Sequence, residues 1–419
     1  MRAGMRILML FVGVALSGSV IAYPAASAAL GAADANGGHL LQMLRFAPRD
    51  VQNVEYANFI GLKRAIGAEI ASMDDVPFPP ESLEGPLTAG QEIGRAWWWD
   101  MSTLIPKSRL VGNDRVPTGE WDRLFGFNLF DVDHELRIGD PPTQVSVIDG
   151  SLDPATIGER LLARGYTHQS SPLGAAATFY SLADNVSRTP DQATRYTGRE
   201  FNRAVTAPGL LIAGSDSNAI DASVRAATGQ AQTLADDPEI ALLATTMDDP
   251  DLLPGTTLLS AMLFSHAMVE RVALANAGVL ACPDEPVERL RERAQRGPTT
   301  PPLMPYSMAG LGYRRGTDLS ERYWLFTLLY PDEATAREAG GVLVDRATRY
   351  RSHQAGGPLV GTYVDAVLDP VVRTDASGAT VSLLLRARPV RLASLFWLWQ
   401  MRDLGFLGVG QILDLCSDG

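Results

Sequence analysis

The chain has 419 residues, 46% hydrophobic and 20% charged, which is enough for two domains that each bury a core. Its net charge of −12 and pI near 5.0 exclude the basic footprint of a nucleic-acid-binding protein. The sequence also has no polybasic patch that would attract anionic lipids.

The N-terminus has the pattern of a secretory signal. Arg2 and Arg6 precede an uncharged apolar run over residues 7–22, and Ala26-Ser27-Ala28 then offers a small-residue cleavage site. We therefore predict a signal peptide over residues 1–28 and an exported protein of the periplasm or cell surface. The alternative is an uncleaved segment, 7–22, that keeps the protein at the membrane.

Residues 29–282 are predicted to form an N-terminal lobe, and its first notable feature is an aromatic cluster. Trp97, Trp98 and Trp99 lie in a segment expected to be helical. Three consecutive residues of a helix cannot all face one core, so at least one of them should lie at a surface groove or under a neighbouring loop. They are the candidate binding residues for a protein or a small apolar ligand.

The pattern of residues 144–182 predicts strand, helix, strand, strand. Residues 144–148 alternate polar and apolar and are rich in β-branched residues, as in a half-buried strand. Asp153 is a good helix N-cap, and Gly165 suits the left-handed residue that ends a helix. Short strands are expected over 166–169 and 178–182.

Three further elements of this lobe are predicted after residue 182. Residues 209–213 indicate a buried strand, and 217–227 indicate a helix capped by Ser215, Asp216 or Ser217. The apolar segment 258–281 is expected to be a helix. Charged residues near its middle would be costly in a bilayer, so it is interpreted as a core helix.

Residues 283–305 are predicted to be a Pro-rich linker to a second lobe, 306–419. That lobe is expected to begin with a strand over 323–330 and a helix. Alternating segments at 363–372 and 380–385 then indicate a hairpin. The order is again β-α-β-β.

The predicted fold class is therefore α+β, with two lobes that share the β-α-β-β order. Each lobe is expected to have a mostly antiparallel or mixed sheet with helices packed on one face. The identities of the residues do not repeat between the lobes, so duplication and a chance likeness both remain open.

The chain has two cysteines, Cys282 and Cys416. In an oxidising compartment an even count permits one disulfide, which would join the C-terminus to the linker region. The alternative is two unpaired thiols.

The motif Ile148-Asp149-Gly150, followed by Asp153 and then Gly165-Tyr166, resembles that of uncharacterised exported bacterial proteins with two α/β lobes. In those proteins a strand leads through an "IxDGxxD" turn into a helix that ends in "GY". The resemblance implies the fold and the export. It implies no functional residues, because such families have no assigned catalytic residues.

No nucleophile elbow, dinucleotide fingerprint, phosphate loop or zinc motif is present in the sequence, and no cofactor is predicted. One metal candidate is Asp131, Asp133 and Glu135, which share one face if the segment is a strand and could offer oxygens to calcium. The favoured interpretation is a solvated strand face, with Val132, His134 and Leu136 turned inward.

Three further clusters of polar residues have structural as well as functional interpretations. Asp248-Asp249-Pro250-Asp251 lacks the glycine of a calcium loop and is better explained by helix capping. His266 and Glu270 share a helical face, but the adjacent Ser265 points away from them. The arginines form either an anion site or solvated helix faces; they are Arg314, Arg315, Arg322, Arg346, Arg349 and Arg351.

Together these features predict an exported, non-catalytic binding or scaffolding protein of the periplasm or cell surface. An exported hydrolase with an unrecognised active site is the first alternative. An accessory subunit of a membrane complex, tethered through residues 7–22, is the second.

Overall fold

The computed structural model describes residues 38–66, 100, 118–140, 142–171, 177–182, 201–265, 301–316, 318, 321–352, 357–388 and 404–408. The predicted signal peptide, 1–28, lies outside these ranges, as does most of the predicted linker.

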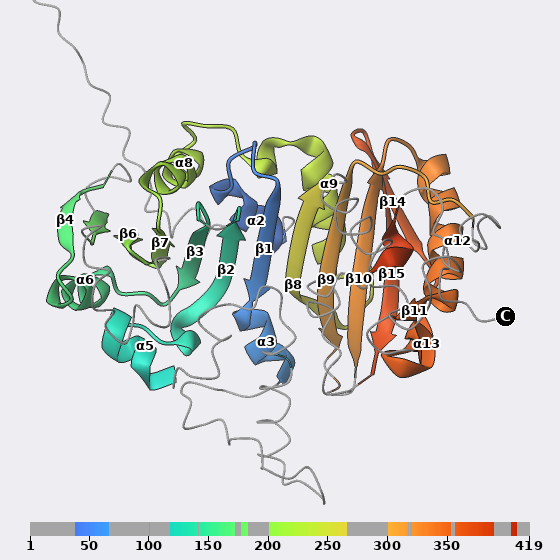
Figure 1. Ribbon diagram of the computed structural model, residues 1–419, viewed down its shortest axis with the longest axis horizontal. Helices are drawn as coiled ribbons and strands as arrows, with labels where there is room; N and C mark the ends of the chain where they lie inside the picture. Colours follow the sequence, from blue (N-terminus) through green and yellow to red (C-terminus); the bar gives the residue numbers. More distant parts are fainter. Residues whose placement is uncertain are drawn as a thin grey trace, which may run out of the picture.

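Strands and helices alternate irregularly along the described chain (Figure 1). The strands are β1 Asn53–Asn58, β2 Val132–Ile138, β3 Val145–Gly150, β4 Thr167–Ser170, β5 Thr178–Ser181, β6 Arg203–Ala207, β7 Leu210–Gly214, β8 Thr256–Ser265, β9 Met308–Gly316, β10 Arg322–Tyr330, β11 Arg351–Ser352, β12 Gly357–Pro358, β13 Val364–Val367, β14 Val371–Asp375 and β15 Gly378–Ala387. The helices are α2 His39–Met43, α3 Phe59–Ile66, α5 Thr118–Phe125, α6 Pro154–Ala163, α8 Ser217–Ala227, α9 Pro238–Asp248, α12 Glu333–Arg349 and α13 Leu359–Thr362, with 3-10 turns η1 Leu44–Phe46, η3 Leu129–Asp131, η5 Leu234–Asp236 and η6 Gly405–Leu407.

Thirteen of the described strands form one sheet. Its order is β13-β15-β10-β9-β8-β1-β2-β3-β7-β6-β5-β4, with β14 also paired to β15. Each ladder between these strands is antiparallel. The α+β class with a large antiparallel sheet is therefore confirmed.

The expectation of two separate sheets is wrong, because β8 of the predicted N-terminal lobe pairs with β9 of the predicted C-terminal lobe. On its other side β8 pairs with β1, from Asn53↔Phe264 to Ala57↔Ser260. Both strands carry buried side chains on both faces. Without this ladder, β1 and β8 would each be an edge strand with unpaired backbone N–H and C=O groups between two apolar faces. The ladder satisfies these groups.

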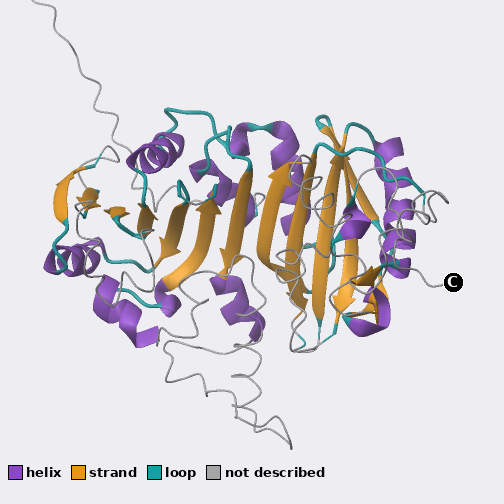
Figure 2. Ribbon diagram, in the orientation of Figure 1, coloured by secondary structure: helices purple, strands orange, loops and turns teal. Residues whose placement is uncertain are grey.

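Helices cover both faces of the sheet, so the prediction that they pack on one face is also wrong (Figure 2). The neighbouring β1 residues Tyr56 and Ala57 belong to different core clusters, which identifies the two clusters with the two faces. Helices α3, α5, α6 and α12 contribute Leu62, Trp121, Ile157 and Leu343 to one cluster. Helices α2, α8 and α9 contribute Met43, Val224 and Leu243 to the other.

The predicted helix over 258–281 begins instead as a strand, β8, in its described part. Leu258 to Phe264 are almost fully buried, and their side chains alternate between the two core clusters. A central strand covered on both faces has a continuous apolar sequence, which periodicity alone does not separate from a buried helix.

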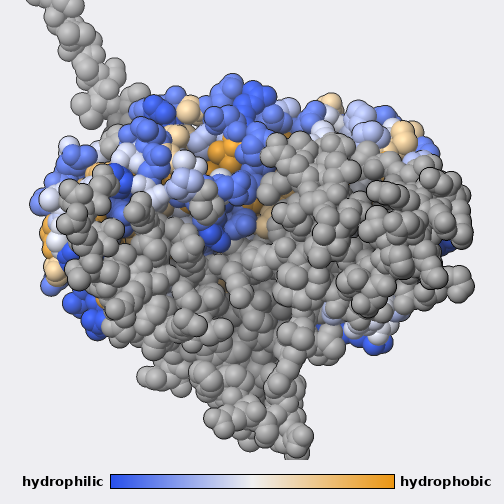
Figure 3. Space-filling view, viewed as in Figure 1, coloured by the Kyte–Doolittle hydropathy of each residue, from blue (hydrophilic) through white to orange (hydrophobic). Residues whose placement is uncertain are grey.

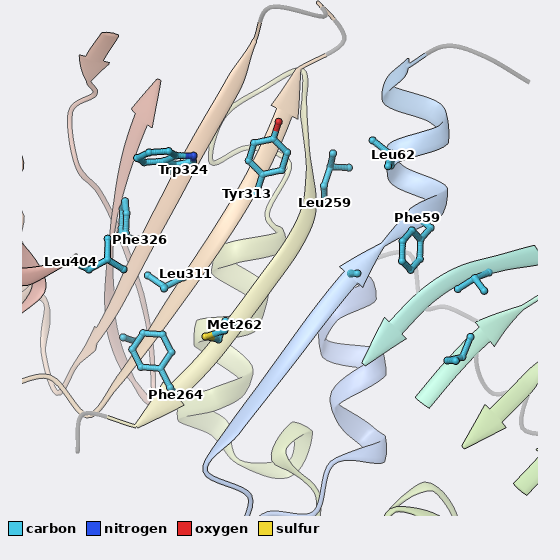
Figure 4. Packing of buried hydrophobic residues seen from close by; sticks show 14 of the residues in the cluster. Phe59, Leu62, Leu259, Met262, Phe264, Leu311, Tyr313, Trp324, Phe326 and Leu404 are labelled. Carbon is cyan, nitrogen blue, oxygen red and sulfur yellow. The ribbon is translucent and has the colours of Figure 1, made fainter. Parts of the chain in front are cut away.

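The core beside β8 combines aromatic and aliphatic side chains (Figure 4). Phe59 and Leu62 of α3 lie beside Leu259 of β8, and Tyr313 and Trp324 follow on β9 and β10. All five residues are nearly fully buried. The sheet junction is therefore covered on this face by α3, which directly follows β1.

The predicted helix starts are confirmed for two helices. The carboxylate of Asp153 accepts from the amides of Ala155 and Thr156 at 3.2 and 3.1 Å at the start of α6. Asp216 accepts from the amide of Asn218 at 2.7 Å at the start of α8. Each carboxylate satisfies amides that the first helical turn leaves free.

The strands on the two sides of the β1–β8 pair follow one another in a similar order. On one side β1, β2 and β3 form a meander, α6 follows, and β7 returns to pair with β3. On the other side β8, β9 and β10 form a meander, α12 follows, and β15 returns to pair with β10. The intervening strands differ, since β11, β12 and α13 come between α12 and β13.

Candidate functional site

A buried histidine–aspartate pair lies on the β2–β3 hairpin. The Nδ1 atom of His134 is 3.0 and 3.1 Å from the two carboxylate oxygens of Asp149. The two residues are direct cross-strand partners and are only 6% and 9% exposed. A carboxylate in this position fixes the orientation of the imidazole and favours a proton on Nδ1.

Two aromatic rings lie against His134. The ring of His39, the first residue of α2, stacks on it with centroids 4.7 Å apart, and the ring of Tyr56 on β1 lies at 5.9 Å. His39 is exposed, whereas Tyr56 is completely buried. His39 is therefore the one member of this ring cluster with a substantial solvent-facing surface.

Asp248, the last residue of α9, anchors the beginning of α2. Its carboxylate accepts from the amide of Leu40 at 3.2 Å. Burial raises the pKa of Asp248, although the amide of Leu40 and the Arg314 guanidinium oppose this effect. The contact joins segments of the chain more than two hundred residues apart.

Two buried polar atoms of this cluster, Nε2 of His134 and the hydroxyl of Tyr56, have no hydrogen-bond partner among the described residues. Burial raises the pKa of Tyr56 well above its ordinary value, and the carboxylates of Asp248 and Asp149 add to the shift. With its Nδ1 proton directed at Asp149, His134 presents Nε2 as an acceptor that could take a proton. The chemistry available here is proton transfer or hydrogen bonding.

The turn after β3 explains how the sequence positions Asp149. Gly150 has φ +150°, and a Cβ added to it would lie 2.0 Å from the carbonyl oxygen of Asp131. Only glycine permits this approach. The amide of Ser151 then donates to the same oxygen at 2.7 Å, and Asp153 begins α6. The "IxDGxxD" residues thus have local structural roles that fix Asp149 on its strand.

A second polar cluster lies on the opposite face of the sheet. The carboxylate of Asp100 accepts from the hydroxyl of Tyr313 at 2.7 Å, from Nε of Arg322 at 3.2 Å and from Nη1 of Arg315. Burial raises the pKa of Asp100, and the two arginines oppose the shift. These contacts fix the residue to β9 and β10, which is a structural role.

Arg346 of α12 joins three segments near the C-terminal end of the described chain. Its guanidinium donates to the carbonyl oxygen of Pro301 at 2.8 Å and to that of Gly408 at 2.6 Å. The side chain is 1% exposed, and burial lowers its pKa to about 10. The bonds connect the segments at Pro301 and Gly408 to one helix.

We expect the Arg346→Met substitution to lower the free energy of unfolding by about 2 kcal/mol, because buried carbonyl oxygens would lose their donors. Arg349→Met on the same helix is the matched control. Arg349 is 62% exposed and forms an i,i+4 ion pair with Asp345, so its loss should cost less than about 0.5 kcal/mol. Urea unfolding of both variants measures the difference, and equal losses would contradict this role of Arg346.

The predicted metal candidates have separate surroundings. Asp131 forms a capping box with Asn128 and precedes β2, while Asp133 lies 3.6 Å from Nζ of Lys63. Glu135 is 2% exposed, so the prediction that it lies on a solvated face is wrong. Within the described ranges, no group of three or more histidine, cysteine or acidic residues could hold a metal ion.

The other clusters are distributed as follows. Asp248 ends α9 and accepts from the amide of Leu40 at the start of α2, and Asp249 forms an ion pair with Arg373 at 3.1 Å, so both residues have structural roles. Arg314 and Arg315 are buried, so the solvated-face interpretation is wrong for them. Trp97 to Trp99, His266, Glu270, Cys282 and Cys416 lie outside the described residues.

The sequence predicts an inward-facing His134 but gives no partner for it, and it places Asp149 only in the turn that leads from a strand into a helix. The available signal was a polar side chain at an inward position on each of two consecutive strands. The pairing itself depends on the hairpin register and on the irregularity between Val132 and His134.

The described surface offers few apolar side chains. Leu162 and Met304 are the large hydrophobic residues that are exposed there, at 44% and 38%. Most of the described surface visible in Figure 3 is hydrophilic. No described helix is both long and apolar enough to cross a bilayer.

Comparisons of the chain with protein-family models, with curated proteins and with solved structures find no match.

Proposed function

We propose that this chain is an exported, non-catalytic binding or scaffolding protein of the periplasm or cell surface. The observation that supports this most is the continuous antiparallel sheet, which joins both halves of the chain through β1 and β8. Buried polar side chains such as Asp100 and Arg346 are bonded to distant segments of the chain. They serve to hold a long, rigid body together, as a scaffold requires.

Export rests on the sequence of residues 1–28. Mass spectrometry of the protein from fractionated cells should find a mature N-terminus after Ala28 in the exported fraction. Leu16→Arg interrupts the apolar run and should retain the precursor in the cytosol, whereas the control Leu16→Val should not. Full export of the Leu16→Arg variant would contradict the proposal.

The partner is proposed to be another protein or a small apolar ligand that contacts Trp97, Trp98 and Trp99. Adjacent tryptophans are typical of interfaces, since each offers a large apolar surface with a polar atom. Replacing all three with alanine should abolish photo-crosslinking at the cell envelope and leave the unfolding transition unchanged. Crosslinking that persists in this variant would rule out these residues as the contact.

An exported hydrolase is the second candidate, and the His134–Asp149 pair favours it. A carboxylate-oriented imidazole is the usual base for activating a hydroxyl or water. We expect no hydrolysis of ester, amide or phosphoester substrates that depends on His134. Activity abolished by His134→Gln but kept by His168→Gln, in folded protein, would establish the hydrolase instead.

A tethered accessory subunit is the remaining alternative. It requires residues 7–22 to stay uncleaved, so the precursor would be recovered intact with the membrane fraction. The same mass-spectrometric measurement therefore distinguishes it from a cleaved, exported protein.

We also propose that the two halves are related copies of one α+β unit. The outward order from β1 and β8, with a helix after the third strand and a returning strand beside it, supports this relation. The extra β11, β12 and α13 would then be an insertion in the second copy.

A further inference from the structure

The stacked pair of His39 and His134 joins an exposed, titratable ring to a buried one. Their centroids are 4.7 Å apart, with 27° between the ring planes. Nδ1 of His134 is already bonded to Asp149. We propose that this histidine stack is an acid-sensitive contact that holds α2 on the sheet at neutral pH and releases it when His39 takes up a proton.

Several charged groups face His39, and they act in both directions. His134 and Arg64 disfavour a proton on it, while Asp149 and Asp133 favour one. Although one side of the ring faces solvent, the partial burial of the other side is the largest influence, and the pKa of His39 is lowered overall. A proton on His39 also adds a positive charge at the first residue of a helix, where the free amides already disfavour cations.

The sign of the pH effect follows from this lowered pKa. The released helix would hold His39 at its ordinary pKa near 6.5, so it binds the proton more readily than the docked helix does. Docking is therefore complete above about pH 6.5 and weakens as the pH falls toward the lowered value. Each unit of difference between the two pKa values changes the docking equilibrium by about tenfold.

Asp248 acts in the opposite direction. Burial raises its pKa, so the docked state gains relative stability as Asp248 takes up a proton. Its carboxylate also accepts from the amide of Leu40. A change at His39 must therefore be separated from a change at Asp248 in any experiment.

Release of α2 from the sheet would have one unfavourable and one favourable effect on the free energy. Leu40 and Met43 would leave the core cluster that they share with Tyr56, which opposes opening. Opening would, however, let water reach Nε2 of His134 and the hydroxyl of Tyr56, which have no partner among the described residues while the helix is docked. This gain makes α2 a suitable element for a reversible contact.

Hydrogen-exchange mass spectrometry of the exported mature protein tests the proposal. Protection of peptides over 39–46, corrected for intrinsic exchange and referred to peptides of α8, should fall about threefold to tenfold between pH 7.5 and 5.5. His39→Phe keeps a ring on His134 but has no proton to take up, and it should show no such fall. His39→Arg should already have low protection at pH 7.5.

His168→Phe is the matched control, because His168 lies on the exposed strand β4 and should leave the pH response intact. Two results would overturn the proposal. One is equal protection of residues 39–46 at both pH values in the unsubstituted protein. The other is a pH response that persists in His39→Phe, which would assign it to Asp248 or another group.

Discussion

Replacing Gly150 with alanine should lower the free energy of unfolding by about 3–5 kcal/mol. The added Cβ would lie 2.0 Å from the carbonyl oxygen of Asp131, and the residue has φ +150°. The obstructing atom belongs to the backbone of the turn before β2 and cannot rotate away. Relief would require the β2–β3 hairpin to shift, which would also displace Asp149 from His134.

Gly165→Ala is the matched control for this prediction. Gly165 also has a positive φ, +87°, but an added Cβ would have no atom within 4 Å. Only the backbone conformation is then strained, so the expected loss is about 1 kcal/mol. Urea unfolding curves of the two variants measure the difference. Similar losses would show that Gly150 is not in close contact with the turn at Asp131.

Removing the carboxylate at position 100 should have an effect of comparable size. Asp100→Ala is expected to cost about 3–5 kcal/mol, because Arg315 and Arg322 would lose a fully buried counter-charge. Tyr313 would also lose the acceptor of its hydroxyl. Thermal and urea unfolding of the variant would report the loss.

Asp365→Ala provides the comparison for a surface pair. Asp365 forms an ion pair with Arg388, but the two side chains are 45% and 41% exposed. Solvent screens such a pair, so its removal should change stability by less than about 1 kcal/mol. A cost for Asp100→Ala that is as small as this would mean that the buried cluster does not join residue 100 to β9 and β10.

The local elements were the part of the fold that the sequence predicted well. The helices that begin after Asp153 and Asp216 depend on a capping carboxylate two or three residues from the amides it satisfies, so the signal lies within one turn. Gly165 likewise acts within its own backbone. Such features need no knowledge of the rest of the chain.

The long-range arrangement could not be predicted in the same way. The pairing of β1 with β8 joins residues about two hundred positions apart, such as Ala57 and Ser260. The sequence of each strand is compatible with either an edge or a central position in a sheet. Which position it takes depends on the other strands of the assembled sheet. The strand β8 was mistaken for a helix because burial on both faces removes the alternation that marks a strand.

The candidate site has the same limitation. His134 and Asp149 face each other only because of the hairpin register. The ring of His39 stacks on His134 from α2, a helix that precedes β1 in the sequence. The sequence contains all three residues without any spacing that would connect them. The binding residues proposed from the sequence, Trp97 to Trp99, lie outside the described part of the chain.

The continuous sheet is the feature on which the scaffold function depends, and hydrogen exchange at the β1–β8 pair tests it most directly. Amides of residues 53–58 and 256–265 should exchange as slowly as those of the neighbouring central strands β2 and β9, because both strands are paired on each side. Fast exchange at these two strands, with slow exchange in β2 and β9, would instead show two separate sheets.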